Sequence, residues 1–329
     1  MAHKGMEIAR EYGVPVTASF HCQAENISSH LFLMNSTRFN TKIYKTLYSY
    51  VYKYCTAVHY PTQFICDVFE RECGHTTNHY VISNGVGKEF VRDPQPKPAE
   101  FADKKVILFT GRYSREKSHR VLIDGVAATR DPGRIQLVFA GCGPLDEKLH
   151  EYAAKVLPAE NQPLFRFFSR PEMLKVLNYA DLYVHPAEIE IEAIACLEAI
   201  KCGLVPVIAD SPRSATRYFA LTEKNLFRYD SPEDLASRID YWLDDPDALE
   251  RCRKARLEIL NEIMIPCIAK PRDHVSEFAP KMLTMKIDVD KIREVIGKGG
   301  SMIQKIVAES GAQVDIDDDG TIHIASPDA

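Results

Sequence analysis

Two glutamates eight positions apart have the residue type and spacing of a ligand-binding pair. Glu190 and Glu198 lie in HPAEIEIEAIACLEAIKCGLVPVIAD, residues 185–210, where an apolar strand leads through a loop into a helix and then a second apolar strand. Eight helical positions separate two side chains by about 12 Å along the axis, whereas glycosidase carboxylates stand roughly 5–9.5 Å apart. The pair suits a sugar hydroxyl and a ribose hydroxyl of one nucleotide-sugar better than a hydrolytic centre. Two solvated glutamates on an ordinary helix are the alternative.

Cations and glycines follow two other apolar runs. Gly111 and Arg112 come directly after the strand VILFT, and Lys117 comes five residues after Arg112. A guanidinium binds phosphate as a fork and an ammonium adds a point charge, so this loop is suited to a diphosphate. Gly141 and Gly143, in GCGP after the next strand, would let the backbone approach a ligand. A solvated turn with ordinary surface charges also fits.

The backbone of the loop that carries Glu190 adds a second phosphate-binding feature. Ile191, Glu192 and Ala193 precede the helix. Because the first amides of a helix have no partner within it, those of residues 191–193 would face the phosphates.

A separate signal points to RNA. Gly297, Lys298, Gly299 and Gly300 join two helical patterns inside a strand–helix–loop–helix–strand order. Glycines allow an RNA backbone to pass close, and Lys298 supplies charge. A glycine turn between packed helices is the alternative.

The composition limits the functional classes. The chain has 329 residues, 45% of them hydrophobic, and a net charge of -5, which disfavours broad coating of nucleic acid. Nine cysteines without a CxxC pair indicate reduced thiols and a cytoplasmic protein, not a disulfide framework or zinc site. We expect no metal.

Alternation of apolar runs and helical patterns predicts an α/β fold with two Rossmann-like lobes. The predicted parts are an incomplete first lobe at residues 1–95, a linker at 96–104, a second lobe at 105–253, a connector at 254–280 and a small α+β domain at 281–329. The expected strands are 14–20, 56–60, 79–83, 105–110, 135–140, 164–168, 181–185 and 205–209.

A tyrosine-rich helical stretch interrupts the first lobe. Tyr44, Tyr48 and Tyr52 recur every four residues and so form one stripe, interleaved with Lys42 and Lys45. The stripe either faces the core, with a solvated basic face opposite, or belongs to a surface helix that contacts anionic lipid.

The combination of GRYSREK, GCGP and EIEIEAIACLE resembles the retaining glycosyltransferases of the two-lobed GT-B type, over roughly residues 5–250. The resemblance implies that Arg112 and Lys117 contact the diphosphate of a UDP-hexose, Glu190 the sugar and Glu198 the ribose. It makes His21 and Glu190 the catalytic candidates and implies no metal. The subgroup acting on diacylglycerol is the most similar, which implies a lipid acceptor and a location that includes the inner face of the membrane.

The segment that contains GKGG closely resembles the KH domain of bacterial polynucleotide phosphorylase. That resemblance implies contact of residues 297–300 with single-stranded RNA, with Ile296 and Ile303 lining the base-binding groove. The domain is of type I, and we expect its last helix to be lacking.

Three accounts of the whole chain follow. The first is a hexosyltransferase with an RNA-binding KH module, with turnover impaired because strands of the acceptor lobe are missing. The second is an RNA-binding fragment of polynucleotide phosphorylase joined to an inactive nucleotide-sugar lobe. The third, a chimera of two partial genes, concerns origin and leaves the chemistry of the residues in place.

Overall fold

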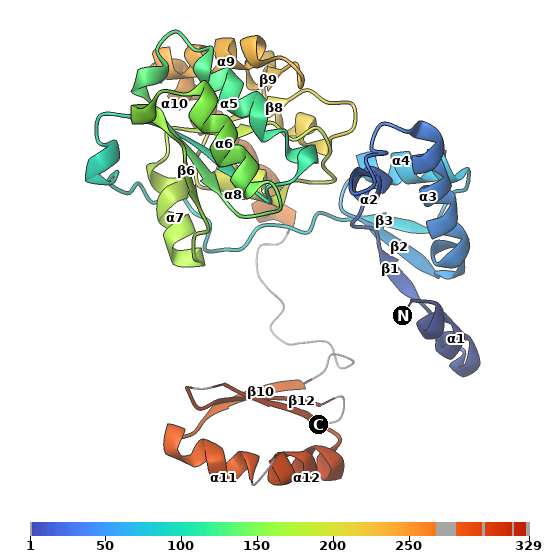
Figure 1. Cartoon of the computed structure of the whole chain (residues 1–329). Coiled ribbons are helices and arrows are strands. Elements are labelled where there is room, and N and C mark those ends of the chain that lie inside the picture. Colours follow the sequence, from blue (N-terminus) through green and yellow to red (C-terminus); the bar gives the residue numbers. More distant parts are fainter. Residues whose placement is uncertain (1, 268–280, 298–299, 318, 327–329) are drawn as a thin grey trace. The chain divides into compact units, whose positions relative to one another are not determined.

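The computed structural model describes residues 2–267, 281–297, 300–317 and 319–326. The chain divides into two compact units, Met1–Ile265 and Pro266–Ala329 (Figure 1). The first unit contains both predicted Rossmann-like lobes, and the second contains the small α+β domain. None of the described helices is long and apolar enough to cross a membrane.

The first lobe is built on three parallel strands in the order β1-β2-β3. Helices lie on one face of this sheet in Figure 1. A core of buried aromatic side chains, among them Phe20 and Phe69, joins the layers. The elements are α1 (Ala2–Tyr12), β1 (Thr17–Ser19), α2 (Ala24–Ser29), α3 (Thr37–Tyr50), β2 (Ala57–Tyr60), α4 (Gln63–Cys73) and β3 (His79–Val81).

The tyrosine stripe faces the core of the first lobe. Tyr44 is 1% exposed and donates a hydrogen bond of 2.8 Å to the Glu25 carboxylate. Tyr48 and Tyr52 are partly buried and pack against the same core. The core-facing interpretation is therefore confirmed, and the basic side chains of α3 lie on its outer side, where Arg38, Lys42 and Lys45 are exposed.

The second lobe is a six-stranded parallel sheet in the order β6-β5-β4-β7-β8-β9. This order places the first and fourth strands of the lobe side by side, at the point where the winding of the sheet reverses. The strands are β4 (Lys105–Thr110), β5 (Ile135–Ala140), β6 (Leu164–Arg166), β7 (Leu182–His185), β8 (Pro206–Ala209) and β9 (Leu226–Phe227). The five strands expected here are present, and the short β9 adds a sixth.

Both faces of this sheet are covered, because alternate residues of each strand point to opposite sides. Ile107 and Phe109 of β4 join the core beneath α5 (His119–Ala127), α6 (Asp146–Val156) and α9 (Pro232–Asp244). Val106 and Leu108 join the core beneath α7 (Arg170–Tyr179) and α8 (Ile194–Lys201). The continuous apolar run VILF reflects this double burial.

Two helices close the second lobe. The Ser231 hydroxyl caps α9 by accepting a hydrogen bond of 3.2 Å from the amide of Asp234. Helix α10 (Pro246–Cys267) continues well into residues 254–280, which were expected to form a connector. The pattern ERCRKARLEIL favours helix throughout, so the first part of this stretch belongs to the second lobe.

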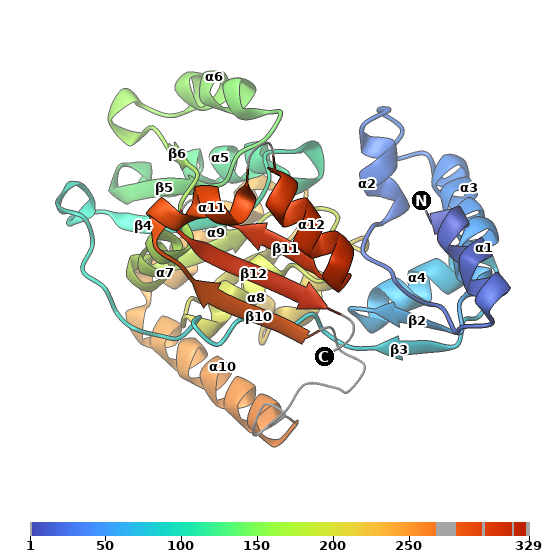
Figure 2. The same cartoon turned by 90° about the horizontal axis from the view of Figure 1, so that it is seen from below.

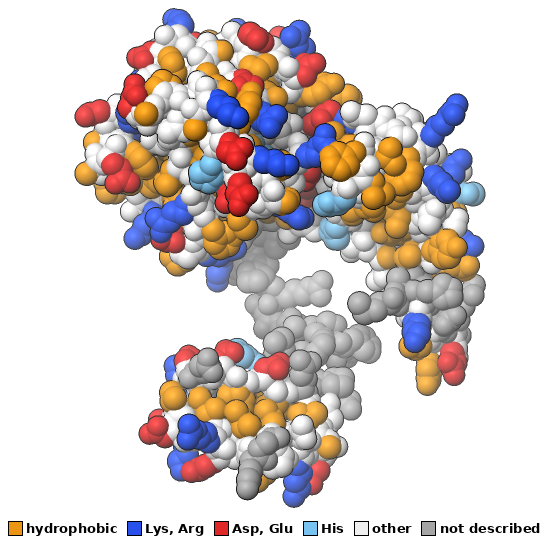
Figure 3. Space-filling view, in the orientation of Figure 1, with side chains coloured by type: hydrophobic (Ala, Val, Ile, Leu, Met, Phe, Trp, Pro, Cys, Tyr) orange, Lys and Arg blue, Asp and Glu red, His pale blue; other side chains and the backbone are white. Residues whose placement is uncertain are grey.

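The second unit has an antiparallel sheet in the order β10-β12-β11, with two helices on one face (Figures 1 and 2). Its elements are β10 (Lys281–Lys286), α11 (Ile292–Ile296), α12 (Ser301–Ser310), β11 (Gln313–Ile316) and β12 (Thr321–Ser326). Hydrophobic side chains gather on its surface in Figure 3, and Leu283, Met285 and Met302 are exposed.

Candidate functional site

The predicted binding residues meet where the sheet of the second lobe reverses. Gly111 and Arg112 follow β4, and Glu190 lies in the loop after β7, the strand that pairs with β4. Because the strands are parallel, both loops leave the same carboxyl edge. Ligands of open α/β sheets bind at this edge. The structure therefore brings the two sequence signals to one site.

Lys117 and Glu190 are directly paired. The ammonium of Lys117 donates a short hydrogen bond to the Glu190 carboxylate, and the two side chains are only 15% and 16% exposed. Lys117 is held in a 3-10 turn, Arg115–Lys117, that follows β4. A partly buried pair of this kind orders both groups before a ligand arrives. The point charge expected at Lys117 is thus held in place by Glu190.

Arg112 is exposed and has no ion pair or hydrogen bond from its side chain within the described residues. It lines a cavity of about 410 Å³ together with Gly111, Ala140, Gly141, Cys142, Gly143, Pro144 and Phe167. An unpaired guanidinium at the mouth of a pocket is available to an anion. The cavity is lined by the loops after β4 and β5. In the sequence, the two loops had in common only that each contains glycine.

The glycines of GCGP are required by contacts between two loops. A Cβ atom on Gly141 would collide with the carbonyl oxygen of Gly111, and one on Gly143 would lie 2.6 Å from the backbone of Tyr113. The Tyr113 amide donates a hydrogen bond of 2.9 Å to the carbonyl oxygen of Cys142. Close packing of the two loops is therefore a reason for these glycines in addition to the expected approach of a ligand.

The loop before α8 presents free amides. Within the described residues, the backbone N–H groups of Ile191, Glu192 and Ala193 have no hydrogen-bond acceptor. Ala193 adopts the left-handed conformation, with φ of 57° and ψ of 62°. That backbone costs an alanine about 1–2 kcal/mol, so the surrounding contacts must impose it. The sequence contained no sign of this strain because the position is not a glycine.

The Glu192 side chain points away from the expected phosphate position and binds the first lobe. Its carboxylate, 4% exposed, accepts a short hydrogen bond from the Ser83 hydroxyl. It also accepts hydrogen bonds from the Asn84 amide at 3.1 Å and from the Asn84 side chain at 2.5 Å. The contribution expected of Glu192, its backbone amide, remains free for a ligand.

Further contacts between the lobes converge on the same region. Ile191 packs against the core of the first lobe, and its carbonyl oxygen accepts a hydrogen bond of 2.8 Å from the Thr62 hydroxyl. Arg213 bridges the two lobes, because it pairs with Glu188 and donates to Asn35 at 3.0 Å. Sequence reasoning missed Arg213. Its position just after β8, at the carboxyl edge, is the signal that could have identified it.

His21 and Glu198 occupy the positions expected from their elements. His21 is exposed just beyond β1, with its ring 5.7 Å from that of His59. Glu198 lies on α8 and has no hydrogen bond from its side chain within the described residues. Burial raises the pKa of Glu198, which the nearby Arg170 partly offsets. A half-buried carboxylate without a partner can accept a hydroxyl of a ligand.

Two histidines that the sequence did not single out are buried behind the site. His119 and His185 are each 2% exposed. Burial lowers the pKa of both to about 3, and the positive charge of Lys117 acts in the same direction. Both imidazoles are therefore neutral, and they pack as aromatic rings against Phe109.

The glycine loop of the second unit is described in part. Gly297 has a φ of 73°, and a Cβ atom there would lie 2.7 Å from that of Met302. Gly300 precedes α12, and Ile296 and Ile303 are half-buried. Lys298 and Gly299 lie outside the described residues. The loop ends therefore need glycine for backbone reasons, whichever ligand is bound.

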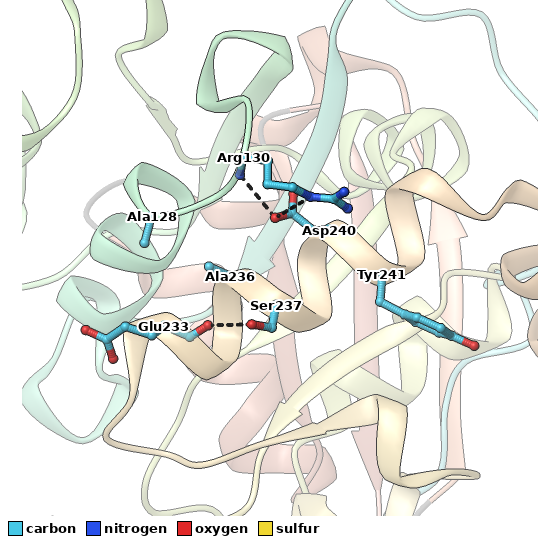
Figure 4. Close-up of a pocket in the computed structure, with 7 residues that line it drawn as sticks. All are labelled: Ala128, Arg130, Glu233, Ala236, Ser237, Asp240 and Tyr241. Carbon is cyan, nitrogen blue, oxygen red and sulfur yellow. Dashed lines mark hydrogen bonds and ion pairs between the residues drawn. The ribbon is translucent and has the colours of Figure 1, made fainter.

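Two further places, one concave and one polar, have polar groups that already bond within the protein. A cavity of about 580 Å³ lies between α5 and α9, where Arg130 forms an ion pair with Asp240 and the Ser237 hydroxyl donates a hydrogen bond to the Glu233 carbonyl oxygen (Figure 4). In the first lobe, the ligand atoms of Cys66, Glu70 and His79 lie within 4.8 Å of one another, as in a metal site. The Glu70 carboxylate already accepts a hydrogen bond of 2.7 Å from the Thr77 amide.

Comparison with protein families assigns both units. Residues 91–258, just over half of the chain, match the family model described as Glycosyl transferases group 1. Residues 282–329 match the KH domain model. The polyribonucleotide nucleotidyltransferase of Ruminiclostridium cellulolyticum is 49% identical over 82 residues, which are 25% of this chain and 12% of that protein. The chain thus spans about an eighth of the length of the curated relative that it matches.

Solved structures resemble the first unit. Anabaena HepE in complex with UDP-glucose matches with a TM-score of 0.63 and 19% identity, over 78% of this chain and 70% of that chain. The catalytic domain of cholesterol-alpha-glucosyltransferase from Helicobacter pylori is 41% identical over 49% of this chain and 98% of that chain, with a TM-score of 0.46. The HepE match supports the two-lobed fold.

Proposed function

We propose, from the premise that this chain belongs to the group 1 glycosyl transferases, that it transfers a hexose from a nucleoside-diphosphate sugar. The observation that carries the proposal is the convergence of Arg112, the Lys117–Glu190 pair and the free amides of residues 191–193 at one edge of the sheet. Cations and amides supply the charge and the donors that a diphosphate requires. The paired carboxylate supplies an acceptor for sugar hydroxyls.

Each residue has a role in this proposal. Arg112 and the amides before α8 neutralise the charge that develops on the leaving diphosphate. Glu190, oriented by Lys117, accepts hydrogen bonds from the hexose, and Glu198 accepts one from the ribose. His21 contacts the sugar from the first lobe. UDP-hexose is the donor, and the configuration at the anomeric carbon is retained. Arg112 and the amides before α8 neutralise the charge of the diphosphate without a metal ion.

Calorimetry with UDP-glucose tests the site. We expect the wild-type chain to bind at millimolar concentration or below. Arg112→Ala should weaken binding about tenfold to a hundredfold, because a charge-assisted hydrogen bond contributes about 1.5–3 kcal/mol. Arg251→Ala, which removes an exposed arginine of α10, is the matched control. The proposal fails if no heat is detected at millimolar donor, or if both variants bind like the wild type.

A lipid acceptor at the membrane surface is the second part of the proposal. Arg38, Lys42 and Lys45 line a cavity of about 310 Å³ on α3, and blue side chains project from the side of the first lobe where α3 lies in Figure 3. A basic helix face is attracted to anionic headgroups. Sedimentation with vesicles that contain phosphatidylglycerol should show binding that Lys42→Glu with Lys45→Glu abolishes. If the double variant sediments with the vesicles like the wild type, the basic face of α3 is not the lipid-binding surface.

Binding of single-stranded RNA is a second candidate function, favoured by the KH domain. The glycine conformations at Gly297 and Gly300 position the loop between α11 and α12, and the N-terminus of α12 follows directly. We expect weak, salt-sensitive binding of an RNA oligonucleotide. Changing Lys298 and Gly299 to Asp should abolish retardation of that RNA in a gel, and unaltered retardation would contradict the assignment.

A further inference from the structure

One arginine of the second lobe is buried without a counterion. Arg256 on α10 is 5% exposed. Its Nε and Nη2 atoms are fully buried, and neither has a hydrogen-bond acceptor within the described residues. A guanidinium has donors in a fixed fork and remains charged in proteins. A buried charge of this kind is strongly unfavourable unless an anion or acceptor satisfies it.

The unsatisfied guanidinium lines an apolar pocket. The pocket has a volume of about 170 Å³ and lies between α8, the segment 218–221 and α10. Its other walls are Leu197, Ile200, Tyr218, Phe219, Leu221, Ile259 and Leu260. Tyr218 is 69% exposed, so the pocket has an opening to solvent near this ring. A ligand with an apolar part and one anionic group would match the apolar side chains and the guanidinium of Arg256, respectively.

Two thiols, those of Cys252 and Cys196, lie near Arg256, and no carboxylate within the described residues forms an ion pair with it. Burial raises the pKa of Cys196 to about 12, so this thiol is uncharged at neutral pH. Glu198, on the same helix as two pocket residues, interacts instead with Arg170 and Glu89. Burial lowers the pKa of Arg256 itself, which is the effect of an environment that disfavours the charge. The missing partner must therefore come from outside the described residues.

We propose that this pocket binds a small organic carboxylate whose aromatic or short alkyl body fills the apolar cavity and whose carboxylate pairs with Arg256. The size is suitable, because a cavity of about 150 Å³ accommodates a benzene ring. The two free N–H groups match the two oxygens of a carboxylate. The site is separate from that of the nucleotide-sugar and does not depend on it.

The position of the pocket gives such a ligand a route to the donor site. Leu197 and Ile200 belong to α8, the helix that carries Glu198 and directly follows the loop with the free amides. A ligand that packs against these two side chains contacts the element that positions the ribose-binding carboxylate. Binding at Arg256 therefore acts as an effector contact on α8.

Calorimetry with benzoate tests the proposal on the full chain. The neutral analogue benzamide has the same shape and no charge, so wild type should bind benzoate at least about tenfold more tightly than benzamide. Arg256→Met keeps the apolar stem and removes the charge, and it should abolish this preference. Arg251→Met, an exposed arginine on the same helix, is the matched control and should leave the preference unchanged.

Two results would overturn the proposal. One is equal or undetectable binding of benzoate and benzamide by wild type. The other is a preference for benzoate that survives in Arg256→Met. If that variant does not fold, the comparison of the two ligands on wild type, together with loss of benzoate binding in Leu197→Trp, which fills the pocket, decides the matter. Benzoate that binds Leu197→Trp as it binds wild type occupies another site, and the proposal is then wrong.

Discussion

Replacement of Glu192 by alanine should remove the contact between the second lobe and the turn at Ser83 and Asn84, and so lower the free energy of unfolding. The buried carboxylate receives hydrogen bonds from the Ser83 hydroxyl and from the backbone and side chain of Asn84. Hydrogen bonds to a charged group contribute about 1.5–3 kcal/mol each, and they are not additive. Since the variant removes all of these hydrogen bonds at once, and since exposed Asn84 can then bond to water, we expect a loss of about 3 kcal/mol in the free energy of unfolding.

A double-mutant cycle isolates the contact from the general cost of a truncation. Ser83→Ala alone should cost about 1 kcal/mol, and the double variant should cost less than the sum by about 0.5–1 kcal/mol. Urea unfolding followed by tryptophan fluorescence and circular dichroism provides the free energies, with exposed Glu258→Ala as a carboxylate control that keeps the Ser83 contact. Donor affinity should fall in Glu192→Ala, because Ala193 then loses a constraint on its left-handed conformation. Unfolding within about 0.5 kcal/mol of wild type, or strict additivity, would refute this reasoning.

The remaining predictions concern acid, a helix cap and metal. Because burial lowers the pKa of His119 and His185 to about 3, the unfolded chain binds two protons that the folded chain does not. The contribution of these histidines to the free energy of unfolding should be fully present above about pH 6.5. It should fall as the pH decreases towards 3, by up to about 1.4 kcal/mol per pH unit for each histidine. A urea midpoint that does not change from pH 7.5 to 4.5 would contradict this. Ser231→Ala should lower stability by about 1 kcal/mol through loss of the α9 cap, whereas Ser231→Asp should not. EDTA should leave UDP-glucose affinity unchanged in calorimetry, and a loss restored by Mg²⁺ would show a metal requirement.

Local patterns in the sequence predicted the elements that carry the site. The run VILFT predicted β4 because both faces of a central parallel strand are buried. The two-lobed fold and the KH order followed from the same kind of pattern. The parallel arrangement also predicted that Gly111 and Glu190 lie at the same edge of the sheet, because both follow the carboxyl end of a strand.

Contacts between distant segments were beyond the sequence. Glu192 was expected to offer its backbone amide to a ligand, and no local pattern showed that its carboxylate binds Ser83, which is 109 positions away. Gly141 serves the packing of two loops, which no local pattern encodes. The left-handed backbone of Ala193 also depends on its surroundings, because alanine does not favour that conformation. Arg256 looked like one of many charges on a helix until its burial was known.

Hydrogen exchange measured with and without UDP-glucose tests the central claim most directly, because it reports where the donor binds. Peptides that cover residues 109–117 and 186–197 should become protected, since they contain Arg112, Lys117 and the free amides before α8. Peptides from α9, beside the cavity of Figure 4, should not change. Protection confined to α9, or no protection at saturating donor, would contradict a nucleotide-sugar site at the carboxyl ends of β4 and β7.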